Sequence, residues 1–232
     1  MVYTEFEDII SQDRMRRYLA ACNFDTRKAM TLYRYNIRLS QELLAVVGCF
    51  EVALRNRINR HFITKYGNDW LRDLILPNGK FYSDPRVEKT KRIIKKAYEG
   101  LMRAHTYSHN KLLSEMEFGI WKYMFSNVQY NLTEQSLLSI FPCKPRSTRI
   151  HRYDNTYIFQ ELDYINNLRN RIAHHEPICF GNGANRNYID TSYALNRYSR
   201  ILILLTWLDI DGLSLLYGLG DIKGICNKIN SL

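Results

Sequence analysis

Apolar residues recur at every third or fourth position over long parts of this chain, and this spacing constrains the fold more than any other feature. One such series after Ser40 consists of Leu43, Leu44, Val47, Phe50, Leu54, Ile58 and Phe62. The spacing is typical of an α-helix that buries one face. Alternation of apolar and polar residues, which marks a half-buried strand, occurs over no useful length. The sequence therefore predicts an all-α protein.

Residues that favour helix ends flank most of these periodic segments. Serine or aspartate precedes several of them, and its side-chain oxygen accepts hydrogen bonds from the free N–H groups of a first helical turn. Pro85 stands directly after Asp84, at a first helical position, and Gly67 follows the series that starts near Ser40. These signals predict helices over residues 14–22, 26–39, 41–66, 86–104, 111–127, 133–141, 154–176 and 191–210.

The length and composition fit a single globular domain. The chain has 232 residues, of which 46% are hydrophobic and 24% are charged, enough to bury a core without a disulfide framework. We therefore expect one helical domain over residues 1–232. The segment 142–151, which contains Pro142 and Pro145 among several basic residues, is the candidate for an internal hinge.

The cysteines and the apolar segments argue against several other classes of protein. The five cysteines are scattered and no Cys-x-x-Cys pair occurs, so we expect no disulfide scaffold, no metal site and no cofactor. The N-terminus lacks the basic and apolar regions of a signal peptide. The most apolar segment, residues 201–210, is shorter than the roughly 20 residues that span a bilayer. We expect a cytoplasmic protein without a membrane partner.

The chain carries an excess of positive charge. It has 33 lysine and arginine residues against 23 aspartate and glutamate residues, which gives a net charge of +10. Such a charge attracts polyanions, although many basic proteins use it only for solubility. In the predicted helix 86–104, a basic run is either a solvated face or a contact for RNA. This run consists of Arg86, Lys89, Lys91, Arg92, Lys95 and Lys96, and its last four residues are the predicted RNA contacts.

The stretch LRNRIAHHEP at residues 168–177 places three chemically useful side chains near the end of a predicted helix. Asn170 and His174 are four residues apart and therefore share a helix face. Arg169 starts about 140° away around the helix, but its long side chain reaches the same region. Pro177 disfavours helical geometry in the residue before it. His174 therefore lies near the helix C-terminus, where the helix dipole favours imidazolium.

These side chains suit the cleavage of RNA without a metal ion. The ribose 2′-OH attacks the adjacent phosphorus, a general base takes its proton, and a general acid protonates the 5′ leaving oxygen. Histidine exchanges protons near neutral pH, and an arginine fork stabilises the growing charge on the phosphate oxygens. We therefore predict Arg169, Asn170 and His174 as catalytic residues. The alternative is that Arg169 forms a structural ion pair with a neighbouring helix.

A general acid and a general base together require a second histidine. A two-fold dimer that joins two copies of the helix end supplies it. The other source is a similar stretch, LRNRINRHF at residues 54–62, with Arg55 and His61. We favour the dimer, because the arginine-to-histidine spacing is one residue longer in that stretch and His61 falls in the middle of its predicted helix. The neighbouring polar residues are predicted only as further RNA contacts: Arg55, Asn56, Arg171 and His175.

The motif and two longer blocks resemble the Abi family (the AbiD/AbiF-like group), which belongs to the HEPN superfamily of α-helical ribonucleases. Residues 168–178 resemble the family signature, residues 13–62 its N-terminal block and residues 112–125 its middle block. The resemblance implies a HEPN-type helical bundle with extra N-terminal and connecting helices. It also implies that Arg169 and His174 form an R-x4-6-H motif whose active site is commonly shared between two protomers.

Members of that family are linked to abortive infection, a response to phage that stops the host by damaging its RNA. Some associate with a small structured RNA, so the resemblance implies an RNA or an antitoxin protein that restrains activity. HEPN proteins also include RNA binders without catalytic activity. Three hypotheses therefore stay open: a metal-independent endoribonuclease effector, a non-catalytic protein that holds a small structured RNA, and a structural partner in a toxin pair.

Overall fold

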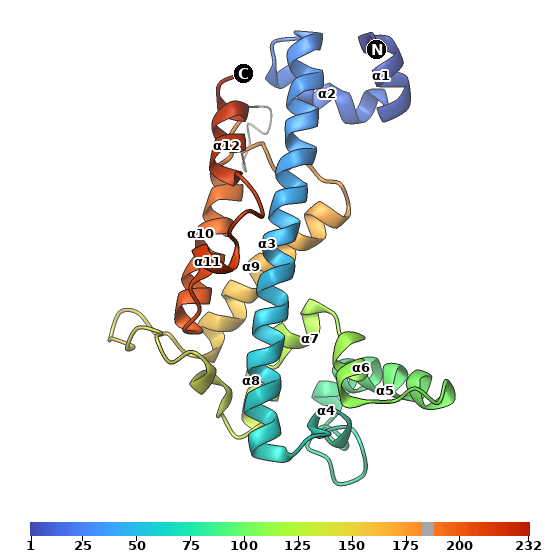
Figure 1. The fold of residues 1–232 in the computed structure, drawn as a ribbon, viewed down its shortest axis with the longest axis vertical. Helices are drawn as coiled ribbons and strands as arrows, with labels where there is room; N and C mark the ends of the chain where they lie inside the picture. Colours follow the sequence, from blue (N-terminus) through green and yellow to red (C-terminus); the bar gives the residue numbers. More distant parts are fainter. Residues whose placement is uncertain (182–187) are drawn as a thin grey trace. The chain divides into compact units, whose positions relative to one another are not determined.

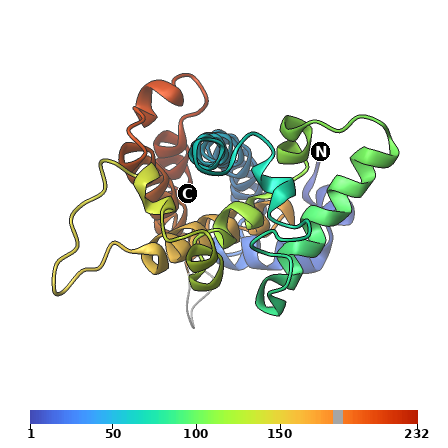
Figure 2. The same cartoon turned by 90° about the horizontal axis from the view of Figure 1, so that it is seen from below.

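The computed structural model describes residues 1–181 and 188–232, and in these ranges the chain folds into helices. An isolated antiparallel bridge joins Phe180 and Ile189, but no strand occurs in the described ranges. The predicted all-α fold class is confirmed. Figures 1 and 2 show the helices in two perpendicular views.

The described residues form twelve α-helices and two 3₁₀ helices. The α-helices are α1 (Tyr3–Ile10), α2 (Gln12–Ala21), α3 (Thr26–Tyr66), α4 (Trp70–Asp73), α5 (Glu88–Arg103), α6 (His109–Ser114), α7 (Phe118–Tyr123), α8 (Asn127–Leu132), α9 (Asn155–Ala173), α10 (Ser192–Trp207), α11 (Gly212–Leu215) and α12 (Ile222–Asn230). The 3₁₀ helices are η1 (Pro85–Val87) and η2 (Leu137–Ile140).

These elements belong to two compact units. Unit 1 comprises Met1–Cys49, Asn167–Ile203 and Gly212–Leu232, and unit 2 comprises Phe50–Asn166 and Leu204–Asp211. Helices α3, α9 and α10 therefore contribute residues to both units. The segment 142–151, which the sequence suggested as a hinge, lies inside unit 2 and forms a largely exposed loop without helix. Figure 2 shows this loop in yellow, extending away from the nearby helices of unit 2.

Helix α3 is longer than the sequence pattern predicted. The segments 26–39 and 41–66, predicted as two helices, form one unbroken helix of 41 residues (Figure 1). Asp25 caps its start, because its carboxylate accepts hydrogen bonds from two N–H groups of the first turn at 2.9 and 3.0 Å. No proline interrupts the helix. Gly67 ends it with a φ of +92°, a backbone angle that glycine adopts without strain.

The middle of the chain forms shorter helices than the sequence predicted. The single helix expected over residues 111–127 is wrong: α6 ends at Ser114, and α7 starts after Glu117, whose backbone is extended. Within residues 133–141, η2 replaces the expected α-helix. Apolar side chains are buried at most positions here, so the pattern has no clear period and tertiary packing sets the breaks. These buried residues include Met116, Phe118, Ile120, Trp121, Met124 and Phe125.

Unit 1 is packed around the first part of α3. The ring of Tyr18 on α2 contacts the ring of Phe180 with 5.1 Å between centroids, and the guanidinium of Arg17 lies 4.2 Å from the centre of the same Phe180 ring. The segment that follows α9 is therefore held against α2. Further buried side chains from α3 and α12 complete this core: Ala29, Leu32, Leu39, Leu43, Ile222, Ile225, Cys226 and Ile229.

Unit 2 is packed around the remainder of α3. The ring of Phe62 contacts the ring of Trp70 with 4.7 Å between centroids. Lys122, which is only 6% exposed, pairs with the carboxylate of Asp163 at 2.7 Å, as a buried charge requires. The predicted apolar stripe of α3 is buried at Phe50, Leu54, Ile58 and Phe62.

A partly buried polar cluster links α3, α4 and α6 within unit 2. The side-chain oxygen of Asn59 accepts hydrogen bonds from the indole N–H of Trp70 and from Nε2 of His109, each at 2.8 Å. The other ring nitrogen of His109, Nδ1, is buried without a hydrogen-bond partner among the described residues. This site therefore fits the neutral imidazole, and burial lowers the pKa of His109 below its ordinary value.

We expect acid to destabilise the protein partly through His109. Because folding lowers its pKa, the unfolded chain binds the proton more readily than the folded chain. The contribution to stability is complete above the unfolded pKa of about 6.5 and is lost as the pH falls through the folded pKa. Thermal unfolding at about pH 7.5 and about pH 5.5 should show a smaller difference in midpoint for His109→Gln than for the wild type.

The exposed His151 provides the matched control for this measurement. His151→Gln should leave the difference in unfolding midpoint between the two pH values unchanged. An equal reduction in both variants would contradict the role assigned to His109.

Candidate functional site

The motif-bearing helix α9 ends earlier than the sequence predicted. It begins after Asp154, as expected, and the carboxylate of that residue accepts the N–H of Tyr157 at 3.0 Å. Its last residue is Ala173 rather than Glu176. His174 is therefore the residue at which the helix ends, and it remains tied to the helix because its N–H donates to the carbonyl of Asn170 at 2.9 Å.

The turn after α9 closes through a regular pair of backbone hydrogen bonds. The N–H of His175 donates to the carbonyl of Ile172 at 3.0 Å, and the N–H of Glu176 donates to the carbonyl of Arg171 at 2.8 Å. This pattern ends a helix with one residue in the left-handed region. His175 is that residue, with a φ of +54°. The structure thus gives His175 a place in the backbone turn beside its predicted role as an RNA contact.

We expect His175→Gly to leave the protein as stable as the wild type or to stabilise it by up to about 1 kcal/mol. Glycine avoids the left-handed cost of roughly 1–2 kcal/mol, which its greater freedom in the unfolded chain partly offsets. His175→Val should instead lower the free energy of unfolding, because a branched side chain is strained at this angle. Urea unfolding measures both changes. A marked loss of stability in His175→Gly would mean that the imidazole itself stabilises the turn.

Arg171 braces the same turn from within the helix. Its Nη2 donates to the carbonyl of Pro177 at 2.6 Å, and its Nε lies 3.4 Å from the carboxylate of Glu176. Its guanidinium also lies 4.5 Å from the centre of the Tyr193 ring on α10. Arg171 was predicted as an RNA contact, and the structure shows that several of its donors are used within the protein.

Two residues from distant parts of unit 1 hold the turn from outside. Nη1 of Arg14 on α2 donates to the carbonyl of His175 at 3.1 Å. The side-chain oxygen of Asn36 on α3, which is 2% exposed, accepts the N–H of Ile178 at 2.8 Å. Backbone groups on both sides of Pro177 are therefore fixed by side chains. Such support holds a functional side chain in a constant position.

The predicted catalytic residues are available to a ligand at this braced turn. Arg169 and Asn170 are half-buried, and His174 is exposed. Within the described ranges, none of these three side chains makes a hydrogen bond or an ion pair. The structural ion pair considered for Arg169 is therefore absent from this part of the chain. An unpaired guanidinium on the helix that ends at an exposed imidazole suits an anionic ligand.

The basic run on α5 is only partly available. Nζ of Lys91 lies 2.6 Å from the carboxylate of Glu88 and donates to the carbonyl of Tyr82 at 3.0 Å. Lys95 lies 3.7 Å from Glu99. Two of its four predicted RNA contacts are exposed and make no ion pair among the described residues, namely Arg92 and Lys96. The run is therefore partly an ordinary surface of paired charges and partly free cations.

The predicted contacts Arg55 and Asn56 belong to unit 2, whereas Arg169, Asn170 and His174 belong to unit 1. Arg55 is half-buried and Asn56 is exposed on α3. The histidine of the same stretch, His61, has both ring nitrogens within hydrogen-bond distance of serine hydroxyls. His61 is therefore held more firmly than His174 and is less free to exchange protons with a substrate.

Sequence reasoning missed the residues that support the turn. Arg14 and Asn36 stand far from the motif in the chain, and neither lies in a local pattern that signals such a contact. Arg57, Arg60 and Lys65, which line a pocket of unit 2, were also missed. The spacing of four residues from Arg57 to His61 and from His61 to Lys65 nevertheless predicts one shared helix face.

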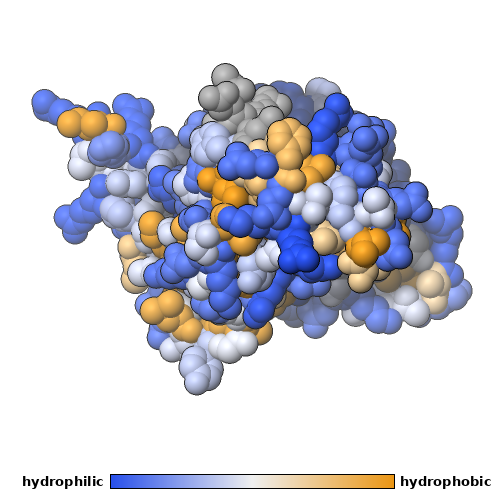
Figure 3. Space-filling view, turned by 90° about the horizontal axis from the view of Figure 1, so that it is seen from above, coloured by the Kyte–Doolittle hydropathy of each residue, from blue (hydrophilic) through white to orange (hydrophobic). Residues whose placement is uncertain are grey.

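Hydrophilic side chains cover most of the described surface drawn in Figure 3, and apolar ones occur there in small groups. Among the described residues, no three histidine, cysteine, aspartate or glutamate side chains are grouped to hold a metal ion. All five cysteines are free thiols. No helix in the described part of the chain has both the length and the apolar content that a membrane span requires.

Comparison with known proteins adds an independent observation. The chain matches the family described as Abi-like protein over residues 3–179, which is more than half of its length. The matched region includes all three predicted catalytic residues. No curated protein and no solved structure matches the chain.

Proposed function

The chain belongs to the Abi-like protein family, and on this premise we propose that it is a metal-independent endoribonuclease of an abortive-infection or toxin–antitoxin-like system. Family membership supports a role related to abortive infection. Assignment to the HEPN superfamily and to the AbiD/AbiF-like group is part of the proposal. The observation that carries it is the unpaired Arg169, Asn170 and His174 at a turn that other side chains hold in place.

The proposed reaction is attack of a ribose 2′-OH on its own 3′ phosphate. One imidazole takes the proton of the 2′-OH, the new 2′ oxygen–phosphorus bond forms, and the 5′ oxygen leaves with a proton from a second acid. Arg169 stabilises the phosphate oxygens, and Asn170 orients either the phosphate or His174. The products are a 2′,3′-cyclic phosphate and a free 5′-OH. DNA lacks the nucleophile and is not cut.

Two copies of the chain provide the acid and the base in this proposal. One copy contributes one exposed, unpaired His174. The other candidate, His61 in the stretch at residues 54–62, has both ring nitrogens within hydrogen-bond distance of serine hydroxyls. This supports a second protomer as the source of the other histidine. A two-fold dimer brings the same surface of each copy together, and so both copies of the motif.

The second candidate function is that of a non-catalytic protein that holds a small structured RNA. The net charge of +10 favours it as much as it favours a nuclease. In that case Arg169 grips a phosphate and His174 takes no part in proton transfer. We place the protein in the cytoplasm with RNA as its partner, and an RNA or a protein antitoxin restrains it.

Incubation of the purified protein with RNA and with DNA of the same sequence, in excess EDTA, separates these functions. We expect the RNA to be cut and the DNA to remain intact. Binding of RNA without cleavage of any RNA tested would favour the second function. Cleavage that stops completely when EDTA is added would contradict a metal-independent mechanism.

A further inference from the structure

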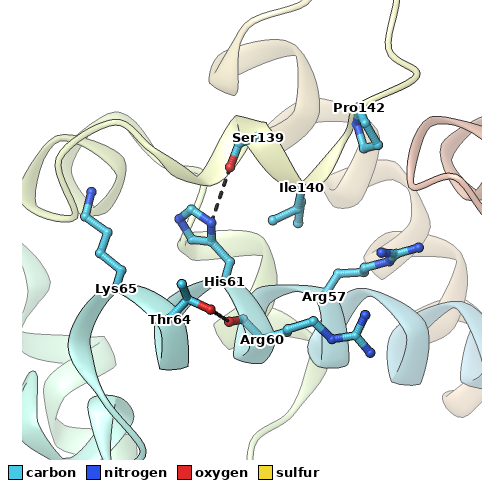
Figure 4. Close-up of a pocket in the computed structure, with 8 residues that line it drawn as sticks. All are labelled: Arg57, Arg60, His61, Thr64, Lys65, Ser139, Ile140 and Pro142. Carbon is cyan, nitrogen blue, oxygen red and sulfur yellow. Dashed lines mark hydrogen bonds between the residues drawn. The ribbon is translucent and has the colours of Figure 1, made fainter.

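A pocket with a volume of about 330 Å³ lies beside α3 in unit 2 (Figure 4). The C-terminal part of α3, from Arg57 to Lys65, forms one wall, and η2 with the residues that follow it forms the other. Figure 4 shows the side chains of Arg57, Arg60 and Lys65 extending from α3 and His61 pointing toward Ser139. The described residues that line the pocket include no aspartate or glutamate: Arg57, Arg60, His61, Thr64, Lys65, Ser139, Ile140 and Pro142.

The positive charge of this pocket is incompletely neutralised. Nζ of Lys65 lies 3.0 Å from the carboxylate of Glu134, and Nζ of Lys80 lies 2.6 Å from the same carboxylate. Among the described residues, the side chain of Arg57 makes only a long hydrogen bond of 3.4 Å to the carbonyl of Asp209, and that of Arg60 has no partner. Two guanidinium groups three residues apart on one helix repel each other until an anion binds between them.

A hydrogen-bond network joins the two walls of the pocket. Nε2 of His61 lies 2.9 Å from the hydroxyl of Ser136, and Nδ1 lies 3.3 Å from the hydroxyl of Ser139. Each hydroxyl also lies near a backbone carbonyl, that of Ser136 at 3.3 Å from the Thr133 oxygen and that of Ser139 at 2.8 Å from the Ser136 oxygen. The imidazole thus ties α3 to η2. The pocket therefore has a hydrogen-bonded wall next to two guanidinium groups, those of Arg57 and Arg60, that have no carboxylate partner among the described residues.

The pocket joins two stretches of the chain that contain no acidic residue. Residues 52–68 include Arg55, Arg57, Arg60 and Lys65 but no aspartate or glutamate. Residues 135–153 include Lys144, Arg146, Arg149 and Arg152, again without an acid. The basic residues of the second stretch lie mainly on the exposed loop that begins at Pro142, which is itself in the pocket lining. A chain of phosphates suits this arrangement better than a single small anion does.

We propose that this pocket binds one phosphate of a nucleic-acid strand whose backbone continues along the basic loop of residues 142–152. Arg57 and Arg60 hold the phosphate through their guanidinium forks, and the loop adds contacts to the neighbouring phosphates. The choice of RNA as the strand rests on the proposed function. The pocket itself is built entirely from unit 2 and requires no catalytic activity.

The test uses the full-length protein and a fluorescent single-stranded RNA that carries 2′-O-methyl groups, so that cleavage cannot affect binding. The double variant Arg57→Ala/Arg60→Ala should bind this probe about tenfold more weakly than the wild type. The dependence of log K on log salt should become less steep by roughly 0.7, because the pocket contacts one phosphate and each phosphate contact to a single strand contributes about that amount. DNA of the same sequence should lose affinity by a similar factor, since the pocket contacts phosphate and not the 2′ position.

The control variant is Lys223→Ala/Lys228→Ala, which removes the same charge from exposed positions of α12 in unit 1. It should change affinity and salt dependence much less. Equal effects of the two double variants would overturn the proposal, because the loss would then reflect net charge alone. Wild-type affinity in a folded Arg57→Ala/Arg60→Ala protein would overturn it as well. Loss of binding in a protein that cuts no RNA would support this pocket while counting against the nuclease.

Discussion

Replacing His174 with alanine should reduce the rate of RNA cleavage by about 10²- to 10⁴-fold, the range that loss of a general acid or base produces. The side chain is exposed and makes no hydrogen bond among the described residues, so its loss should leave the unfolding midpoint unchanged. Affinity for uncleavable RNA should fall only slightly, because a histidine that transfers protons contributes mainly to the transition state. Single-turnover cleavage and thermal unfolding of the same preparation measure these quantities.

The matched control is His105→Asn. His105 is an exposed histidine that belongs to unit 2 and lies outside the motif. Its φ is +53°, an angle that asparagine also tolerates. This variant should cleave RNA at the wild-type rate. Full activity in His174→Ala would show that the imidazole takes no part in the reaction. The family assignment would then stand, but the motif would have no catalytic role.

Replacing Arg169 with alanine should lower kcat/KM for RNA by about 10²- to 10³-fold, because the growing charge on the phosphate then lacks its donor. Arg169→Lys should recover only part of the loss, since an ammonium keeps the charge but lacks the two-pronged geometry of the guanidinium. Neither variant should unfold more readily than the wild type, because Arg169 makes no ion pair among the described residues. Cleavage rates at several RNA concentrations provide the comparison.

The unfolding midpoint of Arg169→Ala distinguishes a catalytic role of Arg169 from a structural one. If Arg169→Ala lowers the unfolding midpoint by several degrees and activity falls in proportion, the guanidinium supports the fold rather than the reaction. If RNA binding weakens with a smaller salt dependence and the wild type cuts no RNA, the non-catalytic function is correct.

The fold class and the starts of three helices could be predicted from local sequence. Asp25 precedes the predicted helix 26–39, Asp84 precedes the proline at the start of another, and the predicted helix 154–176 begins at Asp154. Each of these carboxylates accepts a backbone N–H within the first turn of the helix that follows. The sequence did not predict that two segments join into the single helix α3. Ser40 suggests the start of a new helix, but a serine can also lie within a continuing one. The break at Glu117 was not accessible either, since buried side chains on several faces remove the period that reveals a helix end.

The candidate site was predicted only for those of its residues that lie close together in the sequence. Arg169, Asn170 and His174 follow one another in a short stretch, and their spacing on a helix predicts a shared region. Their support by Arg14 and Asn36 depends on how α2 and α3 pack in unit 1, which the spacing of residues does not contain. The similar stretch at residues 54–62 drew attention to Arg55, whereas the pocket of unit 2 uses Arg57 and Arg60, on a different side of the helix.

The chemical ends of the RNA products test the central claim most directly. After cleavage of a defined RNA in excess EDTA, mass spectrometry of the 5′-terminal fragment should find a 2′,3′-cyclic phosphate, and the other fragment should carry a 5′-OH. A 5′-phosphate with a free 3′-OH would show that water, and not the ribose 2′-OH, attacked the phosphorus, and would contradict the role assigned to Arg169 and His174.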